Sequence, residues 1–541
     1  IDRSVKRVLI GRFELGEMDP DEIVPYAQIP ASVINNEEHR QLALKMARES
    51  MTLLQNKNNI LPLSKGQDRI AVIGPNADDE PMLWGNYNGT PVRTISILDG
   101  ITSKIGEKSI VYDKACDLVE DKVTQSYFSQ ISFDGKPGFK ATYWNTPDYS
   151  GEIVAIQQIV NPIKLTTAGQ HEFASGVKLE GFSGKFVAEY VPEKDQEIVF
   201  NFGATGHFEL FVNGESLRSY NNWRTLPSKI PYKVEKGKKY TIEIHYAQLN
   251  NWQANLEFNF GKEIPVNYED LLKKLKGIET VIFVGGLSTK LEGEEMPVSY
   301  PGFKGGDRTD IALPSVQRNC LKTLKDAGKK VIFVNNSGSA IGLVPETTSC
   351  DAILQAWYGG ESGGQAVADV LFGDYNPSGK LPVTFYKDTT QLPDFEDYSM
   401  NGRTYRFMKA EPLFPFGHGL SYTNFKIGEA QLDKSEIDTS SSVNITISIS
   451  NEGKTEGVEI IQVYVHKQGL EEGPIKTLKG FKRVNLKPNE MKNVTINLPS
   501  NSFEFYDKKA RSMKVMPGNY EIFYGNSSDD KQLKKTELKI H

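Results

Sequence analysis

Runs of apolar residues alternate with helical patterns in two separated parts of the chain. Four runs are apolar almost throughout, at 69–75, 281–285, 330–335 and 352–356. Apolar positions recur at helical spacing at 38–55, 316–326 and 364–372. Strands without polar alternation, joined by helices, are typical of a parallel sheet covered on both faces. The pattern predicts one α/β sandwich domain, split across residues 38–132 and 265–395.

Strict alternation of apolar and polar residues predicts β structure in the two other regions. Alternating segments lie between the halves of the α/β domain, at 140–144, 196–202, 208–214 and 240–246. They predict an all-β insertion over 133–264, in which Asn213-Gly214 forms a hairpin turn. Similar segments after a linker at 396–424 predict a β-sandwich of about seven strands over 425–541. The fold class is therefore α/β plus all-β.

The first residues predict a helix with an uncovered apolar face. Ile1, Val5, Val8 and Leu9 fall on one side of residues 1–9. Because a chain does not usually begin inside a packed helix, we expect residue 1 to be an internal position of a longer protein, whose targeting signals lie outside this sequence.

Length and charge exclude several classes of protein. A chain of 541 residues is too long for one hydrophobic core, so several domains are expected. The net charge of −6 argues against a nucleic-acid partner. No apolar run approaches the ~20 residues that span a bilayer. The three cysteines have no metal-ligand or redox spacing, and the sequence predicts no metal or other cofactor. The sequence leaves open whether the protein forms a homodimer.

An acidic cluster is the leading candidate for chemistry. Glu292, Glu294 and Glu295 lie in a loop that follows the apolar strand 280–284. Loops at the carboxyl ends of strands in open α/β sheets carry the active sites of such folds. One interpretation is a solvated acidic loop. The other is a catalytic carboxyl group that its neighbours keep protonated, so that it acts as a general acid.

Aromatic and charged residues give further candidates. Trp84 and Tyr87 follow the first strand of the α/β domain and would line the cleft or anchor a loop. Trp223 lies in a turn of the β insertion, where it would form part of subsite +1 if that domain leans over the active site; otherwise it is structural. The adjacent opposite charges of Asp307 and Arg308 predict an ion pair that fixes the conformation of their loop. Residues 73–76 lack the glycine-rich turn that a nucleotide-dependent α/β enzyme needs.

Five sequence runs together resemble the family 3 glycoside hydrolases. They are FELGEMD at 13–19, SMTLLQN with LPL at 50–63, WYGGESGG at 357–364, GDYNPSGKLP at 373–382 and LFPFGHGLSYT at 413–423. By this resemblance, residues 1–37 correspond to the end of the family's N-terminal barrel and a linker. The β insertion is similar to a PA14 domain, and 425–541 to the family's fibronectin-III-like module.

The resemblance also implies an activity and a role for Glu292. In the family, the acid/base is a glutamate on a loop of the second domain; Glu292 fits it best, and Glu294 is the runner-up. The nucleophile is an aspartate of the barrel, which lies outside this numbering. The implied reaction is hydrolysis with retention by an exo-acting β-glycosidase, and the implied partners are an oligosaccharide and the N-terminal barrel domain.

Residues 302–310 resemble the β-xylosidase branch of the family more than the glucosidase branch. The predicted substrates are therefore terminal non-reducing β-xylosyl residues of plant-derived oligosaccharides. A β-glucosidase of the same family is the alternative, and a non-catalytic carbohydrate-binding remnant without the barrel represents a different class. Because polymer fragments are found outside the cytoplasm, a periplasmic or secreted protein is expected.

Overall fold

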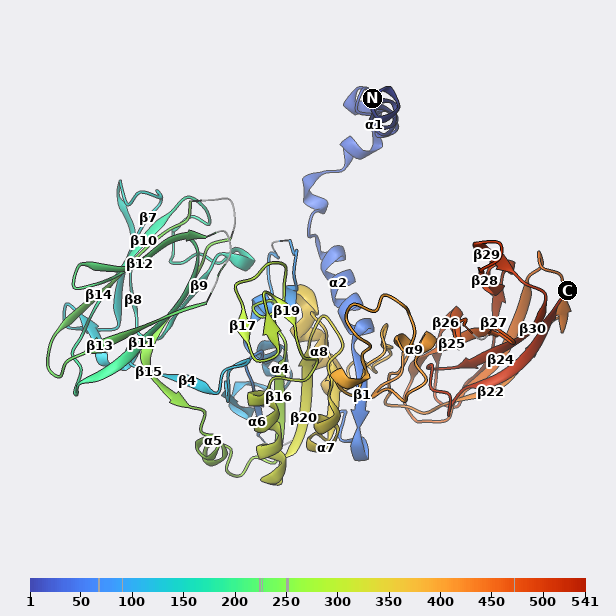
Figure 1. Cartoon of the computed structure of the whole chain (residues 1–541). Coiled ribbons are helices and arrows are strands. Elements are labelled where there is room, and N and C mark those ends of the chain that lie inside the picture. The colour runs from blue at the N-terminus through green and yellow to red at the C-terminus, as the bar shows by residue number, and fades with distance from the viewer. Residues whose placement is uncertain (67–68, 90, 223–224, 226, 250–252, 471) are drawn as a thin grey trace.

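The computed structural model describes residues 1–541 except 67–68, 90, 223–224, 226, 250–252 and 471. Three bodies lie side by side, with the α/β domain in the centre, the β insertion on one side and the C-terminal sandwich on the other (Figure 1). The N-terminal helix projects away from all three. No helix in the described part of the chain is long and apolar enough to cross a membrane.

A six-stranded sheet forms the α/β domain, in the order β1-β21-β20-β16-β2-β3. Five strands are parallel: β2 (Ile70–Ile73), β3 (Ile110–Asp113), β16 (Thr280–Gly286), β20 (Lys330–Asn336) and β21 (Ala352–Gln355). Four of them confirm the predicted apolar runs, whereas β3 was not predicted. The edge strand β1 (Thr52–Asn56) pairs antiparallel with β21.

The predicted helix over 38–55 is therefore wrong in its last part. Helix α2 (Glu37–Ser50) ends before residues 52–56, which form β1 instead. Met51, Leu53 and Leu54 are buried, so an apolar strand continues the apolar stripe of the helix without a break in hydropathy. Pairing with β21 supplies the backbone hydrogen bonds that the helix would have made.

Helices cover both faces of this sheet, and alternate strand residues face two separate cores. One core joins α2, α4 (Ile97–Ile105) and α8 (Gly363–Leu371) to strand residues such as Val72 and Ile282. The other joins α5 (Tyr268–Lys274) and α6 (Ser315–Asp326) to residues such as Ile73 and Phe283. The short helices are α3 (Glu80–Trp84), α7 (Val344–Ser349) and α9 (Thr404–Phe407).

The insertion is an all-β body built on a 12-stranded sheet of described residues. Its longest strand, β11 (Gln196–Val212), merges the two strands predicted at 196–202 and 208–214. The turn between β11 and β12 is Asn213-Gly214, with φ of 53° and 81°, the backbone of the predicted mirror-image hairpin turn. Strand β4 (Lys122–Ser126) pairs with β15 (Asn255–Pro265), so the boundary predicted at 132/133 falls inside this sheet.

The remaining strands of the insertion are β5 (Ile131–Phe133), β6 (Lys136–Pro137), β7 (Phe139–Trp144), β8 (Ile153–Ile159), β9 (Ile163–Thr166), β10 (Ser183–Tyr190), β12 (Glu215–Asn222), β13 (Ser228–Val234) and β14 (Tyr240–Ala247). Their inward side chains form one aromatic-rich core of the insertion.

The C-terminal body is the predicted β-sandwich. One sheet has β22 (Phe425–Leu432), β24 (Val443–Asn451) and β27 (Met491–Leu498). The other has β23 (Glu436–Ile437), β25 (Gly457–Lys467), β26 (Thr477–Leu486), β30 (Gly518–Gly525) and β31 (Lys534–Ile540). A separate ribbon pairs β28 (Glu504–Asp507) with β29 (Ser512–Val515). Inward-facing residues of both sheets share one core.

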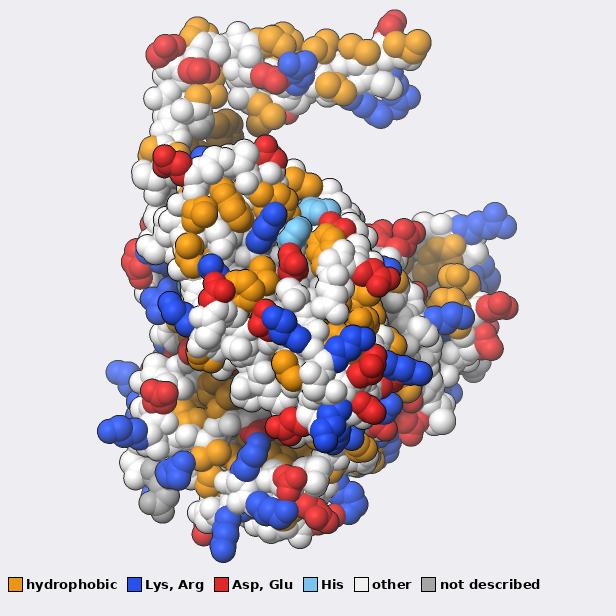
Figure 2. All heavy atoms as spheres, turned by 90° about the vertical axis from the view of Figure 1, so that its left-hand side faces the viewer, with side chains coloured by type: hydrophobic (Ala, Val, Ile, Leu, Met, Phe, Trp, Pro, Cys, Tyr) orange, Lys and Arg blue, Asp and Glu red, His pale blue; other side chains and the backbone are white. Residues whose placement is uncertain are grey.

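The N-terminal helix α1 (Asp2–Glu14) buries none of its residues. Val8 and Phe13 are 62% and 63% exposed, and hydrophobic side chains follow the helix at the top of Figure 2. Short 3-10 turns at Asp21–Ile23, Pro25–Gln28 and Ala31–Val33 lead from α1 to α2. The helix predicted over residues 1–9 is present, and its apolar face is uncovered in this chain.

Candidate active site

Four loops meet at the carboxyl ends of β2, β16, β20 and β21. Because these strands are parallel and adjacent, their following segments gather at one edge of the sheet. The loop after β16 is tightly folded: the amides of Leu291 and Glu292 donate to Ser288 O over 2.9 and 3.3 Å. A three-stranded ribbon of β17 (Ser299–Tyr300), β18 (Phe303–Lys304) and β19 (Asp307–Arg308) follows this loop. The acidic cluster thus lies where the sequence predicted it.

Of the three carboxyl groups in the acidic cluster, that of Glu292 is the one that the fold partly buries. The Tyr358 hydroxyl donates to its Oε1 over 3.4 Å. Burial raises the pKa of Glu292 above its ordinary value, while the Arg308 cation and the Tyr358 hydroxyl act in the opposite direction. A carboxyl group in such a place is suited to general acid work, because its proton is held to higher pH.

The other two carboxylates of the cluster play a different part from the one expected. Glu294 and Glu295 are exposed, and burial, with no contribution from either, accounts for the raised pKa of Glu292. The Tyr87 hydroxyl hydrogen-bonds to Glu294. The prediction that neighbouring carboxylates keep the acid protonated is therefore wrong in its cause, since Glu292 faces Arg308 and Tyr358 instead.

The aromatic candidates occupy different surroundings. Tyr87 is 85% exposed and lies beside Asn86, whose side-chain amide donates to Glu292 O over 3.2 Å. Its segment therefore contacts the acidic loop directly. Trp84 ends α3, donates from Nε1 to Thr94 Oγ1 over 2.8 Å, and packs against the core beneath. Its contacts are those of a loop anchor. Trp223 lies outside the described residues.

Arg308 is a site residue whose surroundings the sequence did not indicate. The predicted pair with Asp307 is not formed: Asp307 is exposed, and Arg308 turns inward. Its Nη1 donates to Ser339 Oγ over 3.1 Å and to Ala340 O over 2.8 Å. Its Nε and Nη2 are buried without a hydrogen-bond partner among the described residues. Those two nitrogens form the edge of a guanidinium that binds carboxylates in a bidentate manner.

Tyr358 was also not singled out, although it lies within the recognisable run WYGGESGG. It follows β21, so the position of that strand's carboxyl end was the available signal. Burial raises the pKa of its hydroxyl, with the Glu292 charge as a second cause, so Tyr358 stays a proton donor to that carboxyl group. Glu292 and Arg308 thus come from the segment between β16 and α6, and Tyr358 comes from the loop after β21.

Comparison with known proteins assigns the class. Residues 51–422 match the glycosyl hydrolase family 3 C-terminal domain, and residues 459–528 match a fibronectin type III-like domain. The chain belongs to glycosyl hydrolase family 3. The first match spans the α/β domain together with the inserted β strands and the linker, and the second lies within the C-terminal sandwich.

Individual relatives carry two kinds of name. The chain is 48% identical to a "Xylan 1,4-beta-xylosidase" of Xylanibacter ruminicola, over 100% of this chain and 62% of that protein. It is 25% identical to a "Periplasmic beta-glucosidase" of Salmonella typhimurium, over 98% of this chain and 54% of that protein. The crystal structure of a β-glucosidase from Kluyveromyces marxianus shares the fold, with a TM-score of 0.68 at 23% identity, over 96% of this chain and 64% of that one. The chain spans less than two thirds of the length of these relatives.

Proposed function

We propose that this chain belongs to a retaining exo-β-glycosidase that removes terminal non-reducing β-xylosyl residues from plant-derived oligosaccharides, with Glu292 as the acid/base. The observation that carries the proposal is the partly buried Glu292, which faces Tyr358 and Arg308 at the carboxyl ends of the parallel strands. Glu294, which is exposed and bonded to Tyr87, is the weaker candidate.

In this proposal Glu292 changes its protonation state during each turnover. Protonated, it donates its proton to the departing glycosidic oxygen while an aspartate nucleophile attacks the anomeric carbon. Deprotonated, it accepts a proton from the water that hydrolyses the glycosyl-enzyme. Burial favours the protonated state needed first, and the Arg308 cation favours the carboxylate needed second.

The nucleophile would come from an N-terminal barrel domain of the same protein. Two observations support a further domain: the chain covers 62% and 54% of two relatives, and α1 has an uncovered apolar face. Tyr87, at the edge of the loop that carries Glu292, would contact the sugar. The interrupting β domain would be a PA14-like module.

The proposed sugar is xylose because the most similar relative named here, at 48% identity, is a xylosidase. A β-glucosidase is the second candidate, supported by the name of the Salmonella relative. That relative's name also supports an extracytoplasmic location.

The test compares kcat/KM of the barrel-containing protein on 4-nitrophenyl β-xyloside and 4-nitrophenyl β-glucoside. Clear preference for the xyloside is expected. Preference for the glucoside would keep the mechanism and reject the proposed sugar. Inactivity on both, and on other aryl glycosides, would favour a non-catalytic carbohydrate-binding protein.

A further inference from the structure

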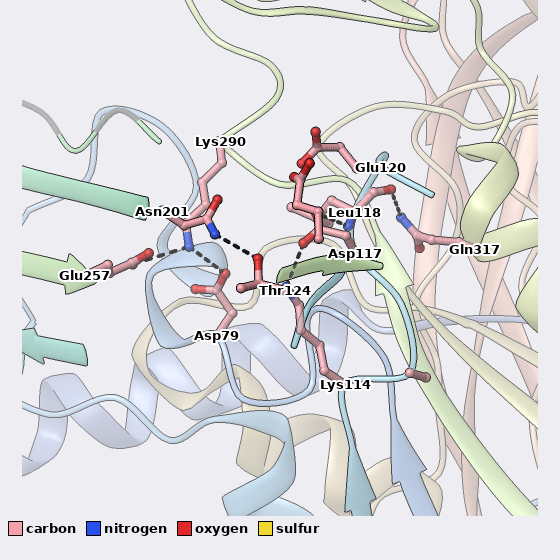
Figure 3. A network of polar contacts seen from close by, with 12 residues as sticks. Asp79, Lys114, Asp117, Leu118, Glu120, Thr124, Asn201, Glu257, Lys290 and Gln317 are labelled. Carbon is pink, nitrogen blue, oxygen red and sulfur yellow. Dashed lines mark hydrogen bonds and ion pairs between the residues drawn. The ribbon is translucent and has the colours of Figure 1, made fainter. Parts of the chain in front are cut away.

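A chain of charges joins the β insertion to the loop that carries Glu292. Lys290, two residues before Glu292, lies between a carboxylate of the α/β domain and a carboxylate of the insertion (Figure 3). Its Nζ is 3.1 Å from Asp79 Oδ2 and 3.6 Å from Glu257 Oε1. Asp79 follows β2, whereas Glu257 belongs to β15 of the insertion. One side chain therefore contacts both bodies.

A second ion pair stands beside the first. Lys164 on β9 lies opposite Glu257 in the pairing of β9 with β15. Its Nζ donates to Asp78 O over 2.7 Å and lies 3.3 Å from Asp78 Oδ2. The insertion thus presents one cation and one anion, and the α/β domain presents the complementary charges from Asp78 and Lys290. Alternating charges of this kind fix the register between two surfaces.

The contact is firmly connected to Glu292. The amide of Lys290 donates to Ser288 Oγ over 3.2 Å, and the amide of Glu292 donates to Ser288 O, so both residues share one tight turn. Asp79 caps α3 by accepting from the amide of Met82 over 3.4 Å. Asn86, just beyond α3, donates to Glu292 O. Asp79 and Asn86 therefore hold the turn from the same side.

Lys290 remains charged in this setting, because the Asp79 carboxylate, together with Glu257, raises its pKa. The side chains of Asp79 and Lys290 are 13% and 30% exposed, so solvent screens their interaction less than that of a surface pair. Glu257, at 36%, is more exposed. The shorter, less exposed contact with Asp79 therefore holds Lys290 in place, and the longer, more exposed contact with Glu257 connects it to the insertion.

We propose that Lys290 is a positioning residue that couples the β insertion to the acid/base loop, so that the placement of the insertion sets the placement of Glu292. This inference rests on the proposed function of Glu292. Glu292 must lie within hydrogen-bond reach of the glycosidic oxygen, and a displacement of about 1 Å costs on the order of 100-fold in rate. A shift of the insertion that displaces Lys290 would change the distance between the Glu292 carboxyl group and the glycosidic oxygen.

The test measures leaving-group dependence in the barrel-containing protein. A displaced general acid harms substrates with poor leaving groups, whereas general loss of structure harms all substrates alike. For Lys290→Met we expect a loss in kcat/KM of about 10- to 100-fold on an unactivated disaccharide. The loss on the matching 4-nitrophenyl glycoside should stay within about threefold, and Lys290→Arg should retain most activity on both.

Lys229 offers a matched control. It also lies between two carboxylates, with Nζ 2.6 Å from Glu120 and 2.8 Å from Glu263, but none of its ion pairs involves the loop of Glu292. Lys229→Met should change both activities equally and by no more than about fivefold. A Lys290→Met variant that behaves like Lys229→Met, or that loses both activities equally, would overturn the inference.

A milder variant covers the case in which Lys290→Met fails to fold. Glu257→Gln keeps the Lys290–Asp79 pair and removes only the link to the insertion; a selective loss of up to about fivefold on the poor leaving group is expected. Equal rates for wild type and Glu257→Gln on both substrates would also contradict the coupling. Glu292→Ala separates the two proposals: if it shows no leaving-group dependence, the acid/base assignment itself fails, whereas a failure confined to Lys290 and Glu257 rejects only the coupling.

Discussion

The ion pair between Arg318 and Glu346 gives a prediction whose size follows from the structure. Arg318 on α6 donates from Nε to Glu346 Oε1 over 2.7 Å and from Nη2 to Oε2 over 3.3 Å. The Glu346 side chain is 1% exposed. Arg318 Nη2 also donates to Gly342 O, over 3.1 Å, in the segment that joins β20 to α7. The same segment supplies the Ser339 and Ala340 oxygens that hold Arg308.

Replacing Arg318 with methionine keeps most of the side-chain volume and removes the charge. Glu346 is then a buried carboxylate without its cation, a change that costs about 3–5 kcal/mol in the free energy of unfolding. The double variant Arg318→Met/Glu346→Leu should recover most of that loss, because a buried ion pair exchanged for apolar residues is roughly neutral. Lys322→Met, which breaks an exposed pair with Asp326 on the same helix, should cost about 0.5 kcal/mol at most.

Hydrogen–deuterium exchange of the peptides covering 315–349, followed as a function of urea, is the appropriate assay. A chain with several domains does not unfold in one transition, so a local readout is needed. If Arg318→Met costs no more than Lys322→Met, or if the double variant is as unstable as the single one, the reasoning from burial and pairing is refuted.

Two further predictions concern the pH dependence of the site and one concerns packing. Arg308→Met removes the cation that favours the Glu292 carboxylate, so the pKa of Glu292 should rise. Because the acid acts when protonated, the basic limb of the pH profile of kcat/KM should move to higher pH. A basic limb that stays in place would contradict this. Tyr358→Phe removes a weaker stabiliser of the same carboxylate, and pH–rate measurements should show a smaller shift in the same direction. In Gly364→Ala the new Cβ would lie 2.0 Å from Ser96 O, so the free energy of unfolding of α8 should fall by about 1–3 kcal/mol. Urea-dependent hydrogen–deuterium exchange of peptides covering α8 measures this, and unchanged protection would contradict it.

The sequence predicted those elements that rest on local pattern. The parallel strands β2, β16, β20 and β21 are apolar almost throughout, and the Asn213-Gly214 turn carries its own backbone preference, so both were found. The parallel edge strand β3, which is only partly buried and ends in Asp113, was not predicted. Strand β1 was not, because its buried residues continue the apolar stripe of α2, and only pairing with β21 distinguishes strand from helix there. Strand β4 was assigned to the wrong body for a similar reason, since its partner β15 lies far along the chain.

In the candidate site, too, features set by local sequence were predicted and features set by distant contacts were not. The position of the acidic loop at a strand end was predicted because the strand and the cluster are visible in the sequence, and the family resemblance favoured Glu292 within it. The direction of Arg308 was not, since its contacts lie with Ser339 and Ala340 after another strand, while the adjacent Asp307 suggested a local pair. The reason for the raised pKa of Glu292 was likewise out of reach, because burial is a property of packing between loops and not of neighbouring residues.

The most direct test of the account is turnover by Glu292→Ala and Glu294→Ala in the barrel-containing protein, with and without added azide. Azide attacks the anomeric carbon of the glycosyl-enzyme in place of water and releases the enzyme's carboxylate, a step that needs no general base. The account predicts that Glu292→Ala loses activity on glycosides with poor leaving groups by about 100- to 10,000-fold, retains much more on activated aryl glycosides, and yields a β-glycosyl azide with azide present. Near-wild-type activity of Glu292→Ala, with this behaviour shown by Glu294→Ala instead, would contradict it.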